Sequence, residues 1–417
     1  MTKKAPFFPC LCFLIALIIV AQTGCSWLSK TRPAKSITSG EFENEYALLL
    51  SRFSKDDPGK GHDRYFEGIE HQPMAYGLII SAEASRFGHS PGEESCQYIR
   101  NAVHWLLDNR DLDDDQFPGW GLPDAWDAFG DGTINPKNHP YTITTAICLL
   151  ALLDALRLPL WDRAERRDII AAVGNVSLKW CRKAWTDIAG GGFFWFSPNS
   201  WDAFFAPNVS AMFLGSLSRA LSEQKRAFSK KEYLFIKDRV DRAAAAIVSA
   251  AIWRQGAPFW NYIVRPGSGP RDDPNDLIHH VYILWGMELY RSSSGKVNLP
   301  WSSERALRSL DRFWKDDKVY DFPQDVAYTG IYSDFNKNQA RLWGIGSALA
   351  FYAKFDDREK AKKIVRLIAQ DYGPFPNLHL LPEAFSKDEN FYTRDAAHIL
   401  WGLAILSSKN IRDLNVR

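Results

Sequence analysis

The segment 110–138 interleaves aromatic rings with carboxylates, at Trp120, Trp126, Phe129, Asp124, Asp127 and Asp131. A sugar presents C–H faces that stack on aromatic rings, and hydroxyl groups that donate hydrogen bonds to carboxylates. The segment therefore has the composition of a glycan-binding surface. We predict that Asp124 or Asp127 lines a groove and is required for catalysis. The alternative is that these carboxylates cap turns in a structural loop.

Aromatic residues recur in two later segments. We expect three of their tryptophans to bind substrate together with Trp120 and Trp126, namely Trp195, Trp201 and Trp260. The alternative is that they pack the loops onto the body of the protein.

Polar residues stand near the starts of five of the six apolar segments described below. We take eight of them as candidate site residues: His139, Tyr141, Asn208, Asp276, His280, Arg341, Arg394 and Asp395. Asp276 precedes His279 and His280 by three and four residues, and Asp395 precedes His398 by three, so each set shares a helix face. A single polar residue at a helix start is usually a cap. The recurrence favours a shared site.

Two patterns suggest a metal or a cofactor, and we set both aside. Asp276, His279 and His280 have the side chains of metal ligands, but no further ligand is close in the sequence. The run Asp111 to Asp114 matches the D-x-D-D pattern of class II terpene cyclases, but it stands in a charged stretch rather than an apolar pocket. We therefore expect neither a metal nor a cofactor, and we interpret the run as a solvated loop.

The chain alternates two kinds of candidate helix. Six segments are apolar on all sides, as helices buried all round are: 72–87, 139–156, 207–222, 275–291, 339–353 and 392–407. Six others are amphipathic, with one wet face: 42–54, 93–109, 162–185, 229–252, 302–316 and 356–371. The spacing, roughly 55 to 70 residues, is longer than that of the short-period helical solenoids. An outer helix followed by an inner helix, six times, predicts an all-α (α/α)6 toroid.

The connections between these segments differ in length. Pro73, Pro140, Pro207 and Pro274 mark the first turns of four inner helices, where a missing N–H costs nothing. Connections from inner to outer helices are short, whereas those from outer to inner helices are long, and 110–138 is the longest. In a ring, all the long connections emerge on one face, so we predict one mouth, surrounded by these loops and by the N-terminal ends of the inner helices. No strand-rich segment is apparent, and no substantial sheet is expected.

The composition bounds the class of protein. The 417 residues are 46% apolar and 24% charged, enough to bury a large core, and we expect one monomeric toroid domain over 41–410. Two N-terminal lysines account for the net charge of +2, so the body is near neutral and a nucleic-acid partner is not expected. Three widely spaced cysteines in the body exclude a disulfide framework: Cys96, Cys148 and Cys181.

The N-terminus has the features of an export signal. Residues 1–24 carry a short basic start and then an apolar run too short for a comfortable membrane span. The run ends in Gly24-Cys25, which resembles the bacterial lipobox, whose Cys is lipidated, although Gln22 departs from the aliphatic residue preferred there. We predict an exported lipoprotein, anchored to a membrane through lipid on Cys25 and facing the periplasm or the cell exterior, with 25–40 as a tether.

The body resembles the (α/α)6-toroid glycan-active enzymes, which include glycoside hydrolases, polysaccharide lyases and uronate epimerases. Four stretches carry the resemblance: GWGLPDAWDAFGDG (119–132), HPYTITTA (139–146), NDLIHHVYILWG (275–286) and YTRDAAHILWG (392–402). The resemblance implies a poly- or oligosaccharide substrate. It is architectural, so no catalytic role transfers residue by residue.

Three functions are compatible with these residues. We favour a glycoside hydrolase acting on a bacterial surface polysaccharide or exopolysaccharide, with Asp124 or Asp127 as one carboxylate and Asp276 or Asp395 as the other. A lyase or epimerase acting on uronates would need a base and groups that neutralise the substrate carboxylate. These residues suit that chemistry: His139, Tyr141, His280, Arg341 and Arg394. A non-catalytic glycan-binding lipoprotein would need the aromatics alone, which leaves the polar helix starts unexplained.

Overall fold

The computed structural model describes residues 39–87, 92–113, 115–128, 132–264, 275–293, 295–326, 328, 334–382 and 390–414. The predicted signal and most of the predicted tether, with Cys25, lie outside the described residues, as do Phe129, Asp131 and Pro274. Within the described ranges, no helix combines the length and the apolar composition needed to cross a membrane.

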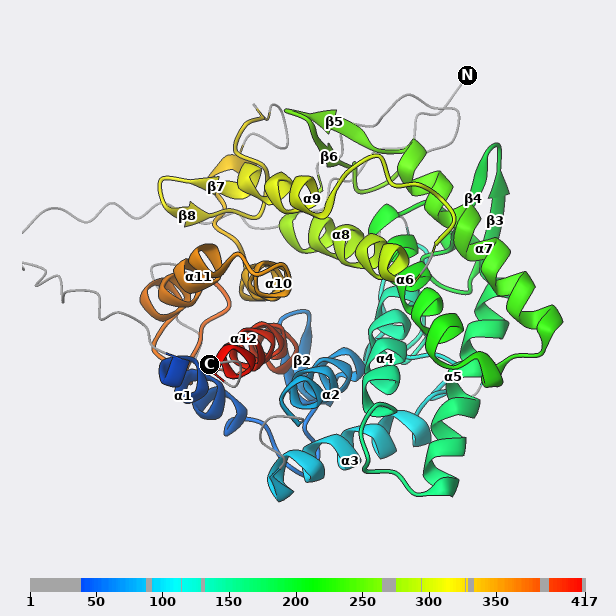
Figure 1. Ribbon diagram of the computed structural model, residues 1–417, viewed down its shortest axis with the longest axis horizontal. Helices are drawn as coiled ribbons and strands as arrows, with labels where there is room; N and C mark the ends of the chain where they lie inside the picture. The colour runs from blue at the N-terminus through cyan, green and yellow to red at the C-terminus, as the bar shows by residue number, and fades with distance from the viewer. Residues whose placement is uncertain are drawn as a thin grey trace, which may run out of the picture.

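Twelve α-helices alternate along the described chain, in the predicted outer and inner order. The outer helices are α1 (Ser39–Leu50), α3 (Glu93–Asp108), α5 (Arg163–Lys183), α7 (Lys230–Ser249), α9 (Ser303–Ser309) and α11 (Arg358–Asp371). The inner helices are α2 (Pro73–Phe87), α4 (Thr142–Ala155), α6 (Pro207–Glu223), α8 (Leu277–Ser292), α10 (Leu342–Lys354) and α12 (Thr393–Leu414). Each inner helix contacts the next, and α12 contacts α2, so the inner helices form a closed ring inside the outer ones (Figure 1).

Small side chains let neighbouring inner helices touch. A Cβ added at Gly286 of α8 would lie 2.0 Å from the carbonyl oxygen of Ala211 in α6. A Cβ added at Gly215 of α6 would lie 2.7 Å from the carbonyl oxygen of Gly286. The two backbones therefore pack closer than any side chain would allow, which explains why the inner segments are rich in Gly and Ala.

The helix starts follow the predicted chemistry in most cases. Helices α2 and α6 begin at Pro73 and Pro207, whereas α4 begins two residues after Pro140. Outer helix α5 begins with a capping box, in which Asp162 accepts hydrogen bonds from backbone N–H groups of the first turn and Glu165 bonds back to the cap.

The sequence analysis identified no strands and predicted no substantial sheet, and the described residues hold four short antiparallel hairpins, each a sheet of two strands only. They are β1 (Lys60–Asp63) with β2 (Phe66–His71), β3 (Trp185–Ile188) with β4 (Gly191–Phe194), β5 (Ile252–Arg254) with β6 (Ala257–Phe259), and β7 (Trp314–Lys315) with β8 (Lys318–Val319). Each hairpin lies in a connection from an outer to an inner helix. A search for helical periodicity overlooks such strands because they are short, although aromatic residues flanking a Gly-rich turn, as at 185–194, are a hairpin signal.

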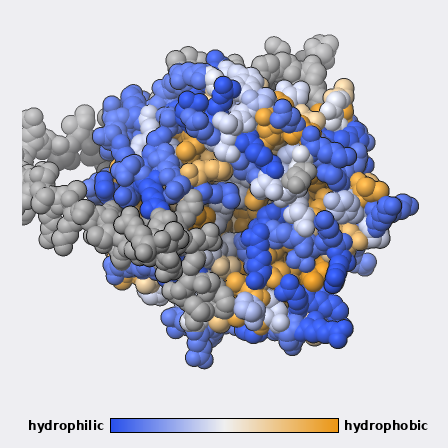
Figure 2. Space-filling view, viewed as in Figure 1, coloured by the Kyte–Doolittle hydropathy of each residue, from blue (hydrophilic) through white to orange (hydrophobic). Residues whose placement is uncertain are grey.

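The two faces of the ring differ. Hairpins and long connections gather where the inner helices begin, at the face predicted to be the mouth. Where the inner helices end, residues from all six line a cavity of about 600 Å³, with Tyr282, Trp285 and Trp401 among them. The inner helices therefore run parallel to one another. The surface is mostly hydrophilic over the outer helices, with apolar residues showing between them toward the middle (Figure 2).

Candidate functional site

Three arginines converge on one indole at the mouth. Trp343 is the second residue of α10, and the guanidinium carbons of Arg64, Arg394 and Arg341 lie 4.3, 5.2 and 5.5 Å from its ring centroid. Arg64 comes from the turn between β1 and β2, Arg341 caps α10, and Arg394 is in the first turn of α12. We call Trp343, Arg64, Arg341, Arg394 and Asp395 the Trp343 cluster. A hairpin and two inner helix starts build it together.

Two of these arginines are ion-paired. Arg394 lies 3.0 Å from a carboxylate oxygen of buried Asp63, in β1. The guanidinium of Arg341 lies 2.8 Å from Asp321 and 3.4 Å from Asp276. These pairs fix the two side chains in place.

Arg64 differs from the other two arginines. It has no carboxylate within ion-pair distance among the described residues, and its hydrogen bond goes to the hydroxyl of Tyr65. Burial lowers the pKa of Arg64, and the nearby positive charge of Arg341 lowers it further. Its guanidinium lies 4.4 Å from the Tyr65 ring centroid and faces Trp343 as well. A half-buried guanidinium held between two rings, without a carboxylate partner among the described residues, can bind an anion.

Asp395 is the carboxylate that the cluster leaves unpaired. It is fully buried in the first turn of α12, and neither of its oxygens accepts a hydrogen bond from a described residue. Burial lowers the pKa values of Arg341 and Arg394, whereas Asp321 and Asp276 raise that of Arg341 and Asp63 raises that of Arg394. The charge of Asp395 adds to the rise for both arginines, so it lies close enough to interact with them electrostatically. A buried carboxylate without partners is costly, and such groups concentrate at functional sites.

Asp276 is held in its ionised form. It caps α8, accepting a hydrogen bond from the backbone N–H of His279, and the imidazole Nδ1 of His279 lies 2.6 Å away. Burial alone would raise its pKa, but His279 and Arg341 outweigh burial and lower the pKa of Asp276 to about 2. Asp321, on the other side of Arg341, has its pKa raised by burial. The guanidinium of Arg341 therefore lies between Asp276, which is held ionised, and Asp321, which takes up a proton more easily than an ordinary aspartate.

His279, rather than the predicted His280, faces this site. His280 is fully buried, shares a hydrogen bond with the Ser309 hydroxyl at 2.7 Å, and has its pKa lowered to about 3 by burial. The ring of His279 lies 4.8 Å from that of Tyr262 and 6.1 Å from that of Trp343. Neighbouring residues on a helix point about 100° apart, so the choice between adjacent histidines needed the orientation of α8.

The predicted tryptophans separate into groups. Trp120 and Trp260 are buried in the core, where their indole N–H groups donate to the backbone carbonyls of Leu106 and Ile247, so we assign them to packing. Half-buried Trp195 donates to Thr186 within its own hairpin. Trp201 is 51% exposed, and Trp126 packs edge-on against Tyr65 with a centroid distance of 5.0 Å. Trp126 is thus the predicted tryptophan that packs beside Tyr65, whose ring in turn lies next to Arg64 and Arg394 of the Trp343 cluster.

The acids of the first long loop lie in different surroundings. Asp124 is exposed and accepts a hydrogen bond from the N–H of Ala125, as a turn-capping carboxylate does. Asp127 is half-buried and accepts one from the N–H of Gly132. Its charge contributes, after burial, to a raised pKa of Tyr141, whose hydroxyl lies near Trp126. That at least one of the two is required for catalysis stays a prediction, and it now rests on half-buried Asp127 rather than on exposed Asp124.

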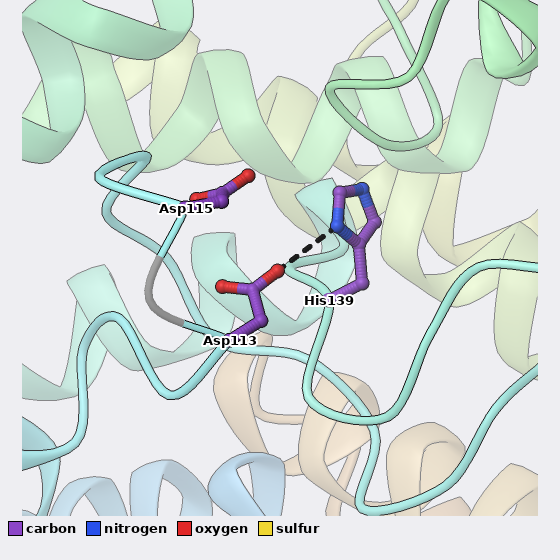
Figure 3. Close-up of side chains that lie close together, drawn as sticks. All are labelled: Asp113, Asp115 and His139. Atoms are coloured by element: carbon purple, nitrogen blue, oxygen red, sulfur yellow. Dashed lines mark hydrogen bonds and ion pairs between the residues drawn. The ribbon is translucent and has the colours of Figure 1, made fainter.

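His139 and Asn208 lie apart from these acids. His139 is buried and meets Asp113 and Asp115 in a separate group (Figure 3). Asn208 is buried in the first turn of α6, where its side-chain oxygen has no hydrogen-bond partner among the described residues. Neither has a contact with the Trp343 cluster among the interactions of the described residues, so their roles at the mouth stay predictions.

Sequence reasoning missed four residues of this site: Asp63, Arg64, Asp321 and Trp343. The first two stand in 56–71, a connection that held no recognised motif. The sequence D-R-Y-F at 63–66, which sets opposite charges beside aromatic rings, is the same alternation that singled out 110–138. Applying that criterion to every long connection would have found them.

Comparison with known proteins bears on the fold. No protein-family model matches the chain, and no curated protein matches it in sequence. A GH76 α-mannanase from Bacteroides thetaiotaomicron matches with a TM-score of 0.58 at 13% identity, over 90% of this chain and 97% of that chain. An unsaturated glucuronyl hydrolase specific for heparin gives 0.57 at 10%, over 91% and 98%. A cellobiose 2-epimerase from Spirochaeta thermophila gives 0.56 at 14%, over 93% and 100%. At these identities the likeness shows a shared fold and nothing further.

Proposed function

We propose that this protein is an exported glycan-active enzyme, a glycoside hydrolase that cleaves an acidic bacterial surface polysaccharide or exopolysaccharide at the Trp343 cluster. The observation that carries the proposal is Asp395, a fully buried carboxylate without a hydrogen-bond partner among the described residues. A structural carboxylate at that depth would be paired, because an unpaired one lowers stability. A catalytic carboxylate must instead be free to exchange a proton with substrate.

Hydrolysis needs one carboxyl as an acid and another as a base. In our assignment Asp395 donates a proton to the glycosidic oxygen while the bond from that oxygen to the anomeric carbon breaks. Asp276, held ionised by His279 and Arg341, removes a proton from the water whose hydroxyl adds to the anomeric carbon.

The substrate class follows from the charges and rings at the mouth. Arg64 is available for a substrate carboxylate, and Trp343, Tyr65 and Trp126 offer ring faces and edges for the sugar. Six inner helices direct their N-terminal ends to this face, and each helix start carries a partial positive charge that favours anions. These features support an acidic glycan over a neutral one.

A uronate lyase or epimerase is the second candidate, and a specific contact favours it. The 2.6 Å contact between Asp276 and His279 Nδ1 is the arrangement that orients an imidazole as a general base. In that reaction His279 would remove the proton from the carbon next to the substrate carboxylate, while the charge of Arg64 neutralises that carboxylate. A non-catalytic glycan-binding protein, the third candidate, requires neither group.

One experiment separates the three candidates. The full-length protein, Asp395→Asn and Asp124→Asn are incubated with uronate-containing and neutral exopolysaccharides, and reducing ends and ultraviolet absorbance are followed together. Hydrolysis gives reducing ends without absorbance, and we expect Asp395→Asn to abolish them while Asp124→Asn, an exposed acid of the same mouth, does not. Absorbance from an unsaturated uronate would replace the hydrolase with the lyase. Full activity in Asp395→Asn would refute the assignment of Asp395 as the proton donor. Tight binding of a polysaccharide without any product would leave the non-catalytic glycan-binding protein as the remaining candidate.

We further propose that the chain is lipidated on Cys25 and exported, from the lipobox-like Gly24-Cys25 after an apolar run. Mass spectrometry of the mature N-terminus tests this proposal. We expect a diacylated or triacylated Cys25. An unmodified N-terminal residue other than Cys25 would leave export in place and exclude the lipid anchor.

A further inference from the structure

A second group of ionisable side chains lies apart from the Trp343 cluster, where the 110–138 segment begins and ends. Asp113 and Asp115 follow α3, and His139 precedes α4. The three point toward one another (Figure 3), and one ligand atom from each lies within 4.8 Å of the other two. The Nδ1 of His139 is 3.1 Å from Oδ2 of Asp113. Two segments separated by more than twenty residues therefore meet at one point.

The burial of His139 distinguishes this group from an ordinary acidic loop. The residue is 4% exposed, and its Nε2 has no hydrogen-bond partner among the described residues. Its single polar contact points into the pair of aspartates. The side chain of Asp113 is 9% exposed, and its Oδ1 is likewise buried without a partner in the described part of the chain. An ion pair between Nδ1 of His139 and Oδ2 of Asp113 leaves the buried Oδ1 of Asp113 without a partner, and a cation bound at this carboxylate would supply one.

We propose that Asp113, Asp115 and His139 bind a divalent transition-metal cation of the Zn²⁺ or Mn²⁺ class, with water completing the coordination. An imidazole and two carboxylates form a mixed nitrogen and oxygen ligand set, which such cations accept, whereas Ca²⁺ and Mg²⁺ prefer oxygen alone. Ligand atoms about 2.1 Å from one cation in tetrahedral geometry lie about 3.4 Å apart. The three side chains therefore have to draw together by about an ångström to close the site, which exposed Asp115 can do as a surface side chain.

The site would act on the mouth from a distance. The cation joins the beginning of the 110–138 segment to its end, and Trp126, which packs against Tyr65, lies between these points. Metal binding should therefore restrict the motion of the loop that carries Trp126 and keep Trp126 in place against Tyr65. This inference does not depend on the proposed hydrolase, because metal binding is measured without turnover.

The test uses the full-length, tag-free protein after chelator treatment and dialysis. Zn²⁺, Mn²⁺, Ca²⁺ and Mg²⁺ are titrated separately by calorimetry, and Co²⁺ is added as a probe whose visible absorbance is strong when the ion is held in a four- or five-coordinate protein site. We expect one equivalent of Zn²⁺ or Mn²⁺ to bind and to raise the melting temperature. Asp115→Asn should weaken binding at least tenfold with the metal-free melting temperature unchanged, because Asp115 is exposed.

Controls make each outcome decisive. Asp124→Asn, an exposed acid of the same segment, should bind metal as the parent does. His139→Asn should lose the Co²⁺ absorbance, and if that variant fails to fold, the Asp115→Asn titration still decides. The inference fails if no cation binds with a stoichiometry near one, if Asp115→Asn binds as tightly as the parent, or if Ca²⁺ binds in preference to Zn²⁺ and Mn²⁺.

Discussion

The two ends of the inner ring both carry charged side chains, and they differ in how completely those charges are paired. Where the helices end, Arg219 lies 2.9 Å from both Asp154 and Glu223, Arg157 lies 2.5 Å from Glu223, and Ser81 donates a hydrogen bond to Asp154. Where the helices begin, half-buried Arg64 and fully buried Asp395 lack such contacts to described residues. Pairing indicates a structural network, whereas charged groups left without partners indicate a site that substrate completes.

The largest effect is expected at Asp395, at the end of the ring where charged groups lack partners. Asp395→Asn should lower kcat about a thousandfold or more, because it removes the proposed proton donor. The same change should leave the free energy of unfolding equal or about 1 kcal/mol higher, because an unpaired buried charge is removed. Steady-state kinetics and denaturant unfolding measure the two quantities. A variant that is inactive because it is unfolded would contradict the comparison.

A substitution where the inner helices end, among the paired charges, should lower stability and leave turnover unchanged. Arg219→Ala leaves Asp154 and Glu223 without their shared partner, and we expect it to destabilise the protein by about 3 kcal/mol. Its kcat at a permissive temperature should stay within about twofold of the parent, since Arg219 lines the opposite face. Thermal melts and turnover assays would check this. A loss of activity larger than the loss of stability would mean that both ends serve catalysis.

Arg64→Gln tests the substrate class. Removing a charge-assisted contact worth about 2 kcal/mol should raise KM for uronate-containing substrates about thirtyfold. Activity on a neutral glycan, where any exists, should change little. Arg308→Gln, on outer helix α9, is the matched control, because its side chain is 58% exposed. An equal loss on acidic and neutral glycans would mean that Arg64 positions Asp395 rather than substrate.

Low pH should lower the stability of the fold at the mouth, because Asp276 becomes protonated. Its pKa in the folded protein, about 2, is below the ordinary value of 3.8, so its ionisation stabilises the fold above pH 4. That contribution, about 2 kcal/mol, is lost as the pH falls from 4 to 2. Asp276→Asn should therefore flatten the dependence of melting temperature on pH in that window. A slope identical to that of the parent would show that Asp276 is not the group held ionised.

The smallest effect is expected at Asp124. Asp124→Asn replaces one exposed turn acceptor with another, so the free energy of unfolding should change by less than about 0.5 kcal/mol and kcat by less than twofold. This expectation reverses what the aromatic setting of the segment suggested. Loss of turnover in this variant, measured with folding intact, would restore Asp124 as a catalytic carboxylate.

The sequence predicted the helices far better than the site. Helix segments are long and periodic, so local residues determine them, and each of the twelve predicted segments holds a helix. The bounds were less accurate: the helix predicted over 302–316 ends at Ser309, and the one predicted over 392–407 continues to Leu414. The site depends on orientation and on distant partners. His279 and His280 could not be distinguished without the rotation of α8, and the pairing of Arg394 with Asp63 joins positions 331 residues apart. Asp395 was predicted because it shares a helix face with His398, but its lack of partners required coordinates.

The same separation along the chain has a consequence for biosynthesis. The contact between Asp63 and Arg394 joins the first hairpin to α12, and α1 also packs against α12. A chain that leaves the ribosome or crosses a membrane from its N-terminus delivers Asp63 and Arg64 long before Arg394 and Asp395. The ring therefore stays open until α12 arrives, and the mouth forms last. A fragment cut before residue 390 would retain five of the inner helices and lack the carboxylate on which we base the proposed reaction.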